Sequence, residues 1–313
     1  MARPELQPGT RRHFPPGTRR RLLWPALATP GAAWIALLFV APLYVVLAVA
    51  FGKLSPLFNS PVPVWNPLQW NGHEFGFVFS HIEGANGIFG PALIRTLAYV
   101  AIASVLCLLV AYPVAYFVAR VAGRHRGIIL AALIAPFWIS YMMRMLAWVN
   151  LLQTNGLVNK TLGLDGLFPV HVNWLEGRPV VVVLGLFYGY VPYMILPLFA
   201  GLDRIPPNML EASRDLGASR LETFRRVTLP LSTPAIVASI LLTTLPMFGD
   251  YFTNDLLSGS PSTSMVGNLI NTATQTNYLA PEAAAFVLLL LVVLIVPMLL
   301  YIRSSNRAEG ARS

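Results

Sequence analysis

Charged side chains are scarce in this chain of 313 residues. Asp, Glu, Lys and Arg together make up 11% of it, hydrophobic residues make up 56%, and the mean hydropathy is +0.62. Soluble domains average about 25% charged residues. A chain this apolar cannot cover itself with polar surface, so we expect lipid to be the solvent around much of it.

Cysteine and catalytic motifs are nearly absent as well. Cys107 is the one cysteine, so neither a disulfide framework nor a cysteine metal site can form within one chain. The sequence holds no G-x-x-x-x-G-K-[ST] phosphate loop, no H-E-x-x-H and no G-x-S-x-G. Gly52-Lys53 continues with Leu54 and does not qualify as such a loop. We therefore expect no catalytic residue, no metal site and no cofactor on this chain.

Long apolar runs are what the sequence has instead. A transmembrane helix needs about 20 mostly apolar residues, and six stretches qualify: about 31–51, 94–119, 127–150, 180–201, 234–253 and 283–302. They predict an all-α integral membrane protein with six transmembrane helices. The first run is too long for a signal peptide and lacks a convincing cleavage site, which favours an uncleaved span. We expect residues 1–30 to be a disordered basic tail, 31–303 the membrane domain and 304–313 a C-terminal tail.

The distribution of positive charge predicts the orientation of the spans. The net charge is +9. One side would carry Arg3, Arg11, Arg12, Arg19, Arg20, Arg21, Arg120, Arg124, Arg126, Arg204, Arg214, Arg220, Arg225, Arg226, Arg303, Arg307 and Arg312. The other would carry only Lys53, Arg95, Lys160 and Arg178. Because positive charge marks the cytoplasmic side, we expect both termini in the cytoplasm. The predicted membrane topology then accounts for the excess of basic over acidic residues, and nucleic acid is not expected as a partner.

A polar segment interrupts the apolar pattern between the fourth and fifth spans: NMLEASRDLGASRLETFRRVTLPLSTP, residues 208–234. Its local signals predict two short helices. The Pro206-Pro207 pair suits a first helical turn, Gly217 suits the left-handed residue that ends a helix, and Ser219–Glu222 is a capping box. Pro230 is expected to end the second helix. Physics alone leaves two interpretations open, an amphipathic helix on anionic lipid or a knob in the groove of a soluble partner.

This segment resembles the EAA signature of permease subunits of bacterial ABC importers. The residues that carry the resemblance are Glu211, Ala212, Ser213, Gly217, Phe224, Leu229 and Pro230, with Ser213 in place of the second alanine. The resemblance implies the type I permease fold, with coupling helices that dock on ATPase subunits, and so favours the knob. It implies that Glu211 and Gly217 shape the knob, that Leu221 and Phe224 are its apolar anchors, and that Arg220, Arg225 and Arg226 form its charged rim.

Three further stretches resemble the spermidine/putrescine branch of these permeases: PFWISYMMRMLAWVNLLQTNGLVN (136–159), FGDYFTNDLLSG (248–259) and MVGNLI (265–270). The resemblance covers nearly all of 31–303 and is greatest to the B-type of the two permease subunits. It implies half of a polyamine pore in the bacterial inner (plasma) membrane. The implied partners are an ABC ATPase dimer with ATP and magnesium, a second (C-type) permease subunit, and a periplasmic or extracellular binding protein.

Other functions remain open at this point. The same architecture would suit another small solute, such as an amino-acid-like compound, an opine or another organic cation. A self-sufficient secondary transporter would be expected to show midplane ion sites and often inverted repeats, and we find neither in the sequence. A membrane enzyme is disfavoured by the lack of a catalytic constellation.

Two ionisable residues fall inside predicted spans, where such residues are costly and often functional. Arg144 and Asp250 would reach similar depths near the outer boundary, where they would either pair or snorkel separately, with a structural role favoured for Arg144. A polyamine needs carboxylates and aromatic faces. The candidates for a substrate path are Asp250, Tyr251, Asp255, Trp138, Tyr141, Arg144, Tyr188 and Tyr193. For any single aromatic residue among them, helix packing or interface anchoring is the plainer interpretation.

The fourth predicted span carries a G-x-x-x-G pair, Gly185 and Gly189, followed by Pro192 and Pro197. Small residues at this spacing allow helices to approach closely, and prolines kink helices. The pattern suits a span that moves against a neighbour and equally a static bundle.

Overall fold

The computed structural model describes residues 28–55, 60–83, 87, 89–162, 172–276 and 279–310. Most of the predicted basic tail, 1–30, lies outside these residues, as do the last three residues of the C-terminal tail. Within the described part, five helices are long and apolar enough to cross a membrane: Ala28–Ala50, α4 (Phe89–Arg120), α8 (Pro179–Asp203), Arg220–Phe248 and Ala280–Leu299. A bent pair of helices makes a sixth candidate, so the expected helical membrane fold is confirmed.

The third predicted span is not the single straight helix that was expected over 127–150. It consists of Gly123–Trp138 and Tyr141–Leu162, which meet at 83°. The first part contains η3 (Gly123–His125), α5 (Arg126–Ile134) and η4 (Ala135–Trp138), and the second contains α6 (Tyr141–Leu152) and α7 (Leu157–Leu162). Pro136 lies at the start of η4, and the backbone of Ile139 and Ser140 is extended. A proline removes a helical hydrogen bond and crowds the preceding turn, which accounts for the change from α5 to η4, while the bend itself lies at the extended backbone of Ile139 and Ser140.

The polar segment also differs from expectation at one point. Helix α9 (Pro207–Asp215) is a separate helix. After it, α10 (Arg220–Thr223), the π-helical turn η6 (Phe224–Thr228) and α11 (Leu229–Phe248) run as one continuous helix. The prediction that Pro230 ends the second helix is therefore wrong. The N–H of Leu229 bonds to the carbonyl of Phe224, five residues back. This wider turn lets the helix pass Pro230, which has no N–H to donate.

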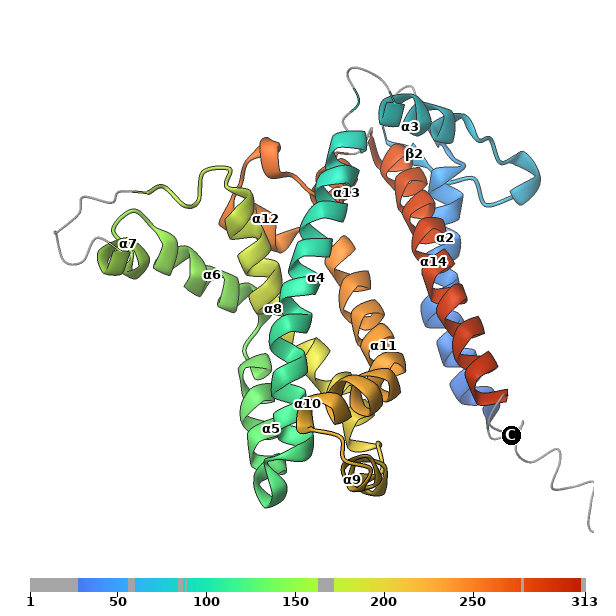
Figure 1. The fold of residues 1–313 in the computed structure, drawn as a ribbon. Coiled ribbons are helices and arrows are strands. Elements are labelled where there is room, and N and C mark those ends of the chain that lie inside the picture. Colours follow the sequence, from blue (N-terminus) through green and yellow to red (C-terminus); the bar gives the residue numbers. More distant parts are fainter. Residues whose placement is uncertain are drawn as a thin grey trace, which may run out of the picture.

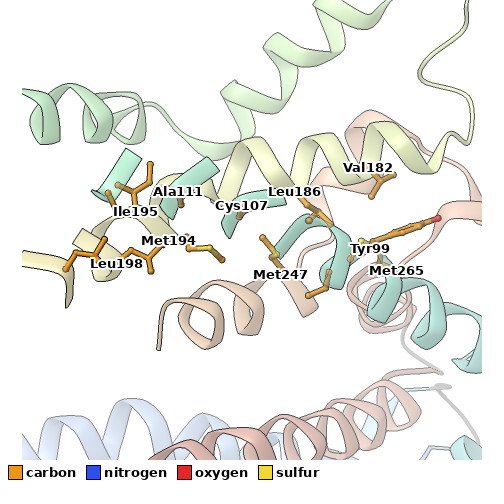
Figure 2. Close-up of a cluster of buried hydrophobic side chains, with 14 of the residues drawn as sticks. Tyr99, Cys107, Ala111, Val182, Leu186, Met194, Ile195, Leu198, Met247 and Met265 are labelled. Carbon is orange, nitrogen blue, oxygen red and sulfur yellow. The ribbon is translucent and has the colours of Figure 1, made fainter. Parts of the chain in front are cut away.

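The core lies where α4, α8 and α11 pack together (Figure 2). Ala103, Cys107, Ala111 and Ala115 recur every four residues on α4 and are all fully buried. A stripe of small side chains lets two membrane helices approach closely, and Leu186 and Met194 of α8 fill the space opposite. Outside this contact, side chains such as Ile94 and Leu109 leave α4 with an exposed apolar face, as expected in lipid.

A second packing unit holds the first and last helices side by side (Figure 1). Its elements are η1 (Ala36–Val40), α2 (Ala41–Ala50), α3 (His73–Glu83), α13 (Val266–Gln275) and α14 (Ala280–Gly310). The rings of Phe89 and Phe286 lie 4.5 Å apart within it. Above α2, strands β1 (Lys53–Leu54) and β2 (Pro61–Val62) pair antiparallel, with Lys53 opposite Val62. The short helix η2 (Pro67–Gln69) follows.

The G-x-x-x-G pair of α8 receives two neighbouring elements. A Cβ atom at Gly185 would lie 2.4 Å from Cδ1 of Leu257, on α12 (Phe252–Leu257). A Cβ atom at Gly189 would lie 2.5 Å from Cε2 of Tyr141, at the start of α6. The missing side chains therefore make room for α12 and for the helix after the break. The short helix η7 (Pro261–Thr263) connects α12 to α13.

Candidate functional site

The α9–α10 knob is the segment from Pro207 to Thr223, formed by α9, a turn and α10. Gly217 has φ +85°. The N–H of Gly217 bonds to the carbonyl of Arg214 at 2.8 Å, and the N–H of Ala218 bonds to the carbonyl of Ser213 at 3.1 Å. These two bonds form a Schellman motif, which ends a helix at a left-handed glycine. The sequence prediction for the end of α9 is thus confirmed.

The second helix of the knob begins with the expected capping box. The N–H of Ser219 donates to Oε2 of Glu222 at 2.9 Å, and the N–H of Glu222 donates to Oγ of Ser219 at 3.3 Å. Two backbone donors that a helix start leaves unsatisfied are therefore bonded reciprocally. Ser213 Oγ and Thr223 Oγ1 lie 3.1 Å apart and join α9 to α10. The knob is held in shape by its own hydrogen bonds.

A hollow of about 600 Å³ lies between the two helices of the knob. Its lining residues are Met209, Ala212, Ser213, Leu216, Gly217, Ala218, Glu222, Arg226 and Val227. Leu216 is 90% exposed, more than the expected anchor Leu221, and Met209 is also exposed. Sequence reasoning missed Leu216 and Met209, although a large apolar residue directly before a helix-ending glycine is a signal that could have identified Leu216.

Phe224 does not act as an outward anchor. Its ring packs edge-on against Tyr112 and Tyr116 of α4, with centroid distances of 5.9 Å and 5.7 Å. Because the helix continues into α11, residue 224 falls on the face that meets α4. Among the other residues of the EAA resemblance, Ser213 is half-buried, and the exposed ones are Glu211, Ala212, Gly217, Leu229 and Pro230. The three arginines of the predicted rim, Arg220, Arg225 and Arg226, are exposed as well.

A polar cluster lies at the opposite end of the core from the knob (Figure 1) and consists of Tyr141, Asp250, Thr253, Asp255 and Asn268. We call it the outer polar cluster after the side of the membrane that the charge distribution predicts for it. Asp250 is buried, directly after α11. Its Oδ1 accepts a bond from the N–H of Thr253 at 3.0 Å, and its Oδ2 accepts bonds from the hydroxyls of Thr253 at 2.8 Å and Tyr141 at 2.7 Å. Both oxygens of this candidate substrate ligand are engaged by protein donors.

Arg144 adopts neither of the two arrangements that were considered for it. Among the described residues it forms no ion pair with Asp250, and with 6% exposure it does not snorkel. Its guanidinium carbon lies 4.9 Å from the ring centroid of Phe137 and 5.4 Å from that of Tyr141. Cation–π contact replaces the ion pair. The 83° bend before Tyr141 changes the position that a straight helix would have given Arg144.

Asp255 is the accessible carboxylate of the outer polar cluster. Asn268 is buried on α13, and its Nδ2 donates to Oδ1 of Asp255 at 2.6 Å and to the carbonyl of Tyr251 at 2.9 Å. Its Oδ1 accepts a bond from the N–H of Met265 at 2.9 Å, which determines the orientation of the amide. Sequence reasoning missed Asn268. Its place three residues after Met265, at the start of a helix, is the signal that could have found it.

Tyr251 borders a mainly apolar cleft of about 510 Å³ between α11, α13 and α14. The lining side chains with polar groups are Tyr251, Asn271 and Thr274, and the rest of the wall comes from residues such as Leu245 and Leu294. The ring of Tyr251 stacks on Phe252 with centroids 4.1 Å apart. Tyr251, at the edge of the cleft, and Asp255, on α12, are both bonded to the side chain of Asn268.

The remaining candidate aromatics are not gathered around Asp250. Trp138 is exposed, Tyr188 packs on Trp148 at 5.4 Å between ring centroids, and Tyr193 packs on Phe137 at 4.8 Å. Tyr190, which the sequence analysis did not select, lies beside Tyr141 with ring centroids 5.9 Å apart. In the part of the chain that the structure describes, no three His, Cys, Asp or Glu residues are grouped to hold a metal ion.

Comparison with protein families matches residues 94–308 to the family described as binding-protein-dependent transport system inner membrane component. Among curated proteins, the spermidine/putrescine transport system permease protein PotB of Escherichia coli (strain K12) is 33% identical over 219 residues, which are 70% of this chain and 79% of that protein. The protein of the same name from Haemophilus influenzae is 29% identical over 278 residues, covering 88% of this chain and 91% of the relative.

Solved structures with similar folds include a bacterial alginate ABC transporter in complex with an alginate pentasaccharide-bound periplasmic protein. One of its chains matches with a TM-score of 0.68 at 20% identity, over 93% of this chain and 96% of that one. A chain of the MetNI methionine ABC transporter, in an inward-facing conformation, matches with a TM-score of 0.52 at 16% identity, over 70% and 95% of the two chains. At these identities the likeness shows the fold alone.

Proposed function

This chain belongs to the family of inner membrane components of binding-protein-dependent transport systems, and on that premise we propose that it forms half of the pore of a polyamine importer. It is a multi-pass permease subunit with the type I fold of ABC importers and is not itself catalytic. Spermidine and putrescine are the proposed substrates. The second half of the pore would come from another permease subunit of the C-type, and a periplasmic binding protein would deliver the substrate.

The similarity to the PotB proteins carries the proposed substrate class. Two relatives with this name are 33% and 29% identical to the chain, and they cover 70% and 88% of it. The matches thus extend over the spans, the α9–α10 knob and the outer polar cluster rather than over one motif. Another small solute, such as an amino-acid-like compound, an opine or a different organic cation, is the alternative within the same architecture.

The geometry of the α9–α10 knob supports the proposal that an ATPase dimer docks there and supplies the energy for transport. ATP and magnesium would be bound by that partner. The knob offers a preformed hollow lined by Leu216, which is 90% exposed, and the charged residues Glu222 and Arg226 belong to the same lining. An apolar side chain set in a charged rim suits insertion into the groove of a soluble protein. The C-terminal end of α14 and the knob lie at the same end of the molecule (Figure 1). We accordingly place the knob and both termini in the cytoplasm.

Asp255 is our proposed contact for a substrate ammonium group. The Asp255 carboxylate is exposed, and Asn268 donates a hydrogen bond to one of its two oxygens. This bond fixes the orientation of the carboxylate. Asp250 lies deeper and is already bonded to Tyr141 and Thr253. An ammonium group of a polyamine would form a charge-assisted hydrogen bond with an exposed carboxylate. The aromatic residues Tyr251 and Phe252, whose rings stack on each other, lie three to four residues before Asp255 in the chain.

Reconstitution tests the proposal. The chain is expressed with the proposed partners, an ATPase, a second permease and a binding protein, and the complex is placed in proteoliposomes. Uptake of labelled spermidine and putrescine should be saturable, should require ATP and should require the binding protein. Uptake of an opine or an amino acid, with no competition by polyamines, would refute the substrate class. Transport by this chain without any ATPase would refute the importer and support a secondary transporter.

A further inference from the structure

One face of α4 touches both ends of the α9–α10 knob. Tyr112, Tyr116 and Arg120 are spaced four residues apart near the end of this helix, so their side chains lie on one face. We call these three residues the α4 stripe. Each of them contacts a segment that flanks the knob, either at the end of α8 or at the start of α11.

Arg120 holds the leading end of the knob. Its NH2 group donates to the carbonyl of Leu202 at 2.5 Å and to the carbonyl of Ile205 at 2.8 Å. The last carbonyls of a helix lack partners within it, and the two residues after Ile205 are prolines, which have no N–H to offer. A guanidinium also suits the negative end of a helix dipole. Arg120 therefore adds side-chain donors at a junction where Pro206 and Pro207 offer none, and the carbonyl of Leu202 also accepts a bond from the N–H of Ile205 at 3.3 Å.

The two tyrosines hold the trailing end. Phe224 lies at the π turn directly after α10, and its ring meets both Tyr112 and Tyr116 edge-on. The hydroxyl of Tyr112 is 2.9 Å from Oγ of Ser232, two turns further along the same continuous helix. The trailing end of the knob thus joins α4 through a small aromatic cluster and one hydrogen bond. Edge-to-face aromatic contacts are directional, and they resist sliding more than an aliphatic contact does.

We propose that the α4 stripe carries movement of the knob into the packed core of α4, α8 and α11, with Arg120 as a positioning residue. The knob is closed by its own bond between Ser213 and Thr223. With both flanks tied to one face of α4, a force on the knob moves α4 with it instead of flexing the proline junction. The inference rests on the proposed docking of an ATPase at the knob and goes beyond it by naming the residues that connect that surface to the spans.

A nearby ion pair offers a matched control. Arg126, at the start of α5, lies 3.3 Å from Asp203, at the end of α8, so it contacts the same end of α8 as Arg120 does, but from α5 instead of α4. The two side chains are 58% and 40% exposed. Exposed ion pairs contribute little because water and salt screen them. Replacement of Arg126 therefore removes a positive charge at the same junction without removing the buried hydrogen bonds.

The first experiment compares Arg120→Gln with Arg126→Gln in the complete complex with its ATPase. In Arg120→Gln the ATPase should still co-purify and hydrolyse ATP, while substrate imported per ATP falls about tenfold, in the range of measured coupling energies. In Arg126→Gln that ratio should stay within about twofold of the wild type. An unchanged ratio in Arg120→Gln, or an equal fall in both variants, overturns the proposal.

A second measurement avoids the risk that Arg120→Gln fails to fold. Cys107 is the one cysteine of the chain and is buried, so a Cys107→Ala background accepts spin labels at Val121→Cys and Asn208→Cys, both at exposed positions. The distance between the labels should be the same with and without ATP, because α4 and the knob move as one body. A shift between these states overturns the proposal. If the wild-type chain retains no ATPase at all, the proposed function fails and this assignment fails with it.

Discussion

Tyr141 and Asp250 are joined by a 2.7 Å hydrogen bond from the phenol hydroxyl to Oδ2 of the carboxylate. The bond connects the helix that follows the break in the third span to the loop after α11. The same ring lies 5.4 Å from the guanidinium carbon of Arg144. One aromatic side chain thus stands between the two charges that the sequence places at similar depths.

Replacing Tyr141 with phenylalanine should destabilise the permease. The variant keeps the ring for Arg144 but removes one of the donors to a buried carboxylate, which costs about 1–3 kcal/mol. Thermal unfolding of the purified subunit in detergent measures the loss. Tyr193→Phe is the control, because it removes the same atom from an exposed side chain and should leave the unfolding temperature unchanged. Equal unfolding temperatures for the two variants would contradict a structural role for the Tyr141 hydroxyl.

Asp255→Asn should raise the polyamine concentration that gives half-maximal uptake. A hydrogen bond to a charged group contributes about 1.5–3 kcal/mol, and 1.4 kcal/mol is a factor of ten in affinity, so we expect a rise of about tenfold. Asn268→Ala should act in the same direction, because it frees the carboxylate that Asn268 holds. Glu176→Gln, at another exposed carboxylate, in the turn that precedes α8, is the control. A similar rise in Asp255→Asn and Glu176→Gln would indicate a general surface-charge effect and would contradict a specific role for Asp255.

Leu216→Glu should prevent the ATPase from co-purifying. Leu216 is 90% exposed at the hollow of the α9–α10 knob, and apolar anchors at the centre of an interface cost about 2 kcal/mol or more when they are lost. Leu68→Glu is matched to it, since Leu68 is 94% exposed in η2, far from the knob. Retention of the ATPase by the Leu216 variant would remove this residue from the docking surface.

Gly217→Val should uncouple ATP hydrolysis from transport or prevent assembly. None of the atoms that the structure describes lies within 4 Å of a Cβ placed at Gly217, so a clash is not the cause. The cause is φ +85°, a left-handed conformation that costs an ordinary L-residue about 1–2 kcal/mol. Gly217→Asn is the control, because asparagine tolerates this conformation better than most residues. The ratio of substrate imported to ATP hydrolysed distinguishes the two variants, and normal coupling in Gly217→Val would count against the knob geometry.

Gly185→Ala should destabilise the protein, whereas Gly127→Ala should not. A Cβ at Gly185 would lie 2.4 Å from Cδ1 of Leu257 and 2.6 Å from Cγ2 of Thr253, whereas none of the described atoms lies within 4 Å of one at Gly127. Overpacking costs about 1–3 kcal/mol, while alanine in an open helical position gains about 1 kcal/mol over glycine. Opposite shifts in unfolding temperature are expected, and shifts of the same sign would show that α12 adapts to the added methyl group.

The helices, the caps of the knob and the family resemblance were all readable from residue patterns. Runs of about 20 apolar residues predict spans because the thickness of the lipid sets the length of a helix that crosses it. Gly217 and the Ser219–Glu222 box predicted helix ends because those interactions involve residues close together in the chain. The same local reasoning failed at Pro230, where a π turn carries the helix onward, and at the bend between Trp138 and Tyr141.

Contacts between distant segments came from the folded chain alone. Residue patterns allowed an ion pair between Arg144 and Asp250, and folding set Tyr141 between them instead. They marked Phe224 as an outward anchor, and the continuous helix turned it onto Tyr112 and Tyr116. The sequence analysis did not select Asn268, and although its place near a helix start was visible, its bond to Asp255 on another helix was not. Local periodicity specifies an element and its ends, whereas the partner of a side chain depends on how helices far apart in sequence pack, and packing is a property of the whole fold.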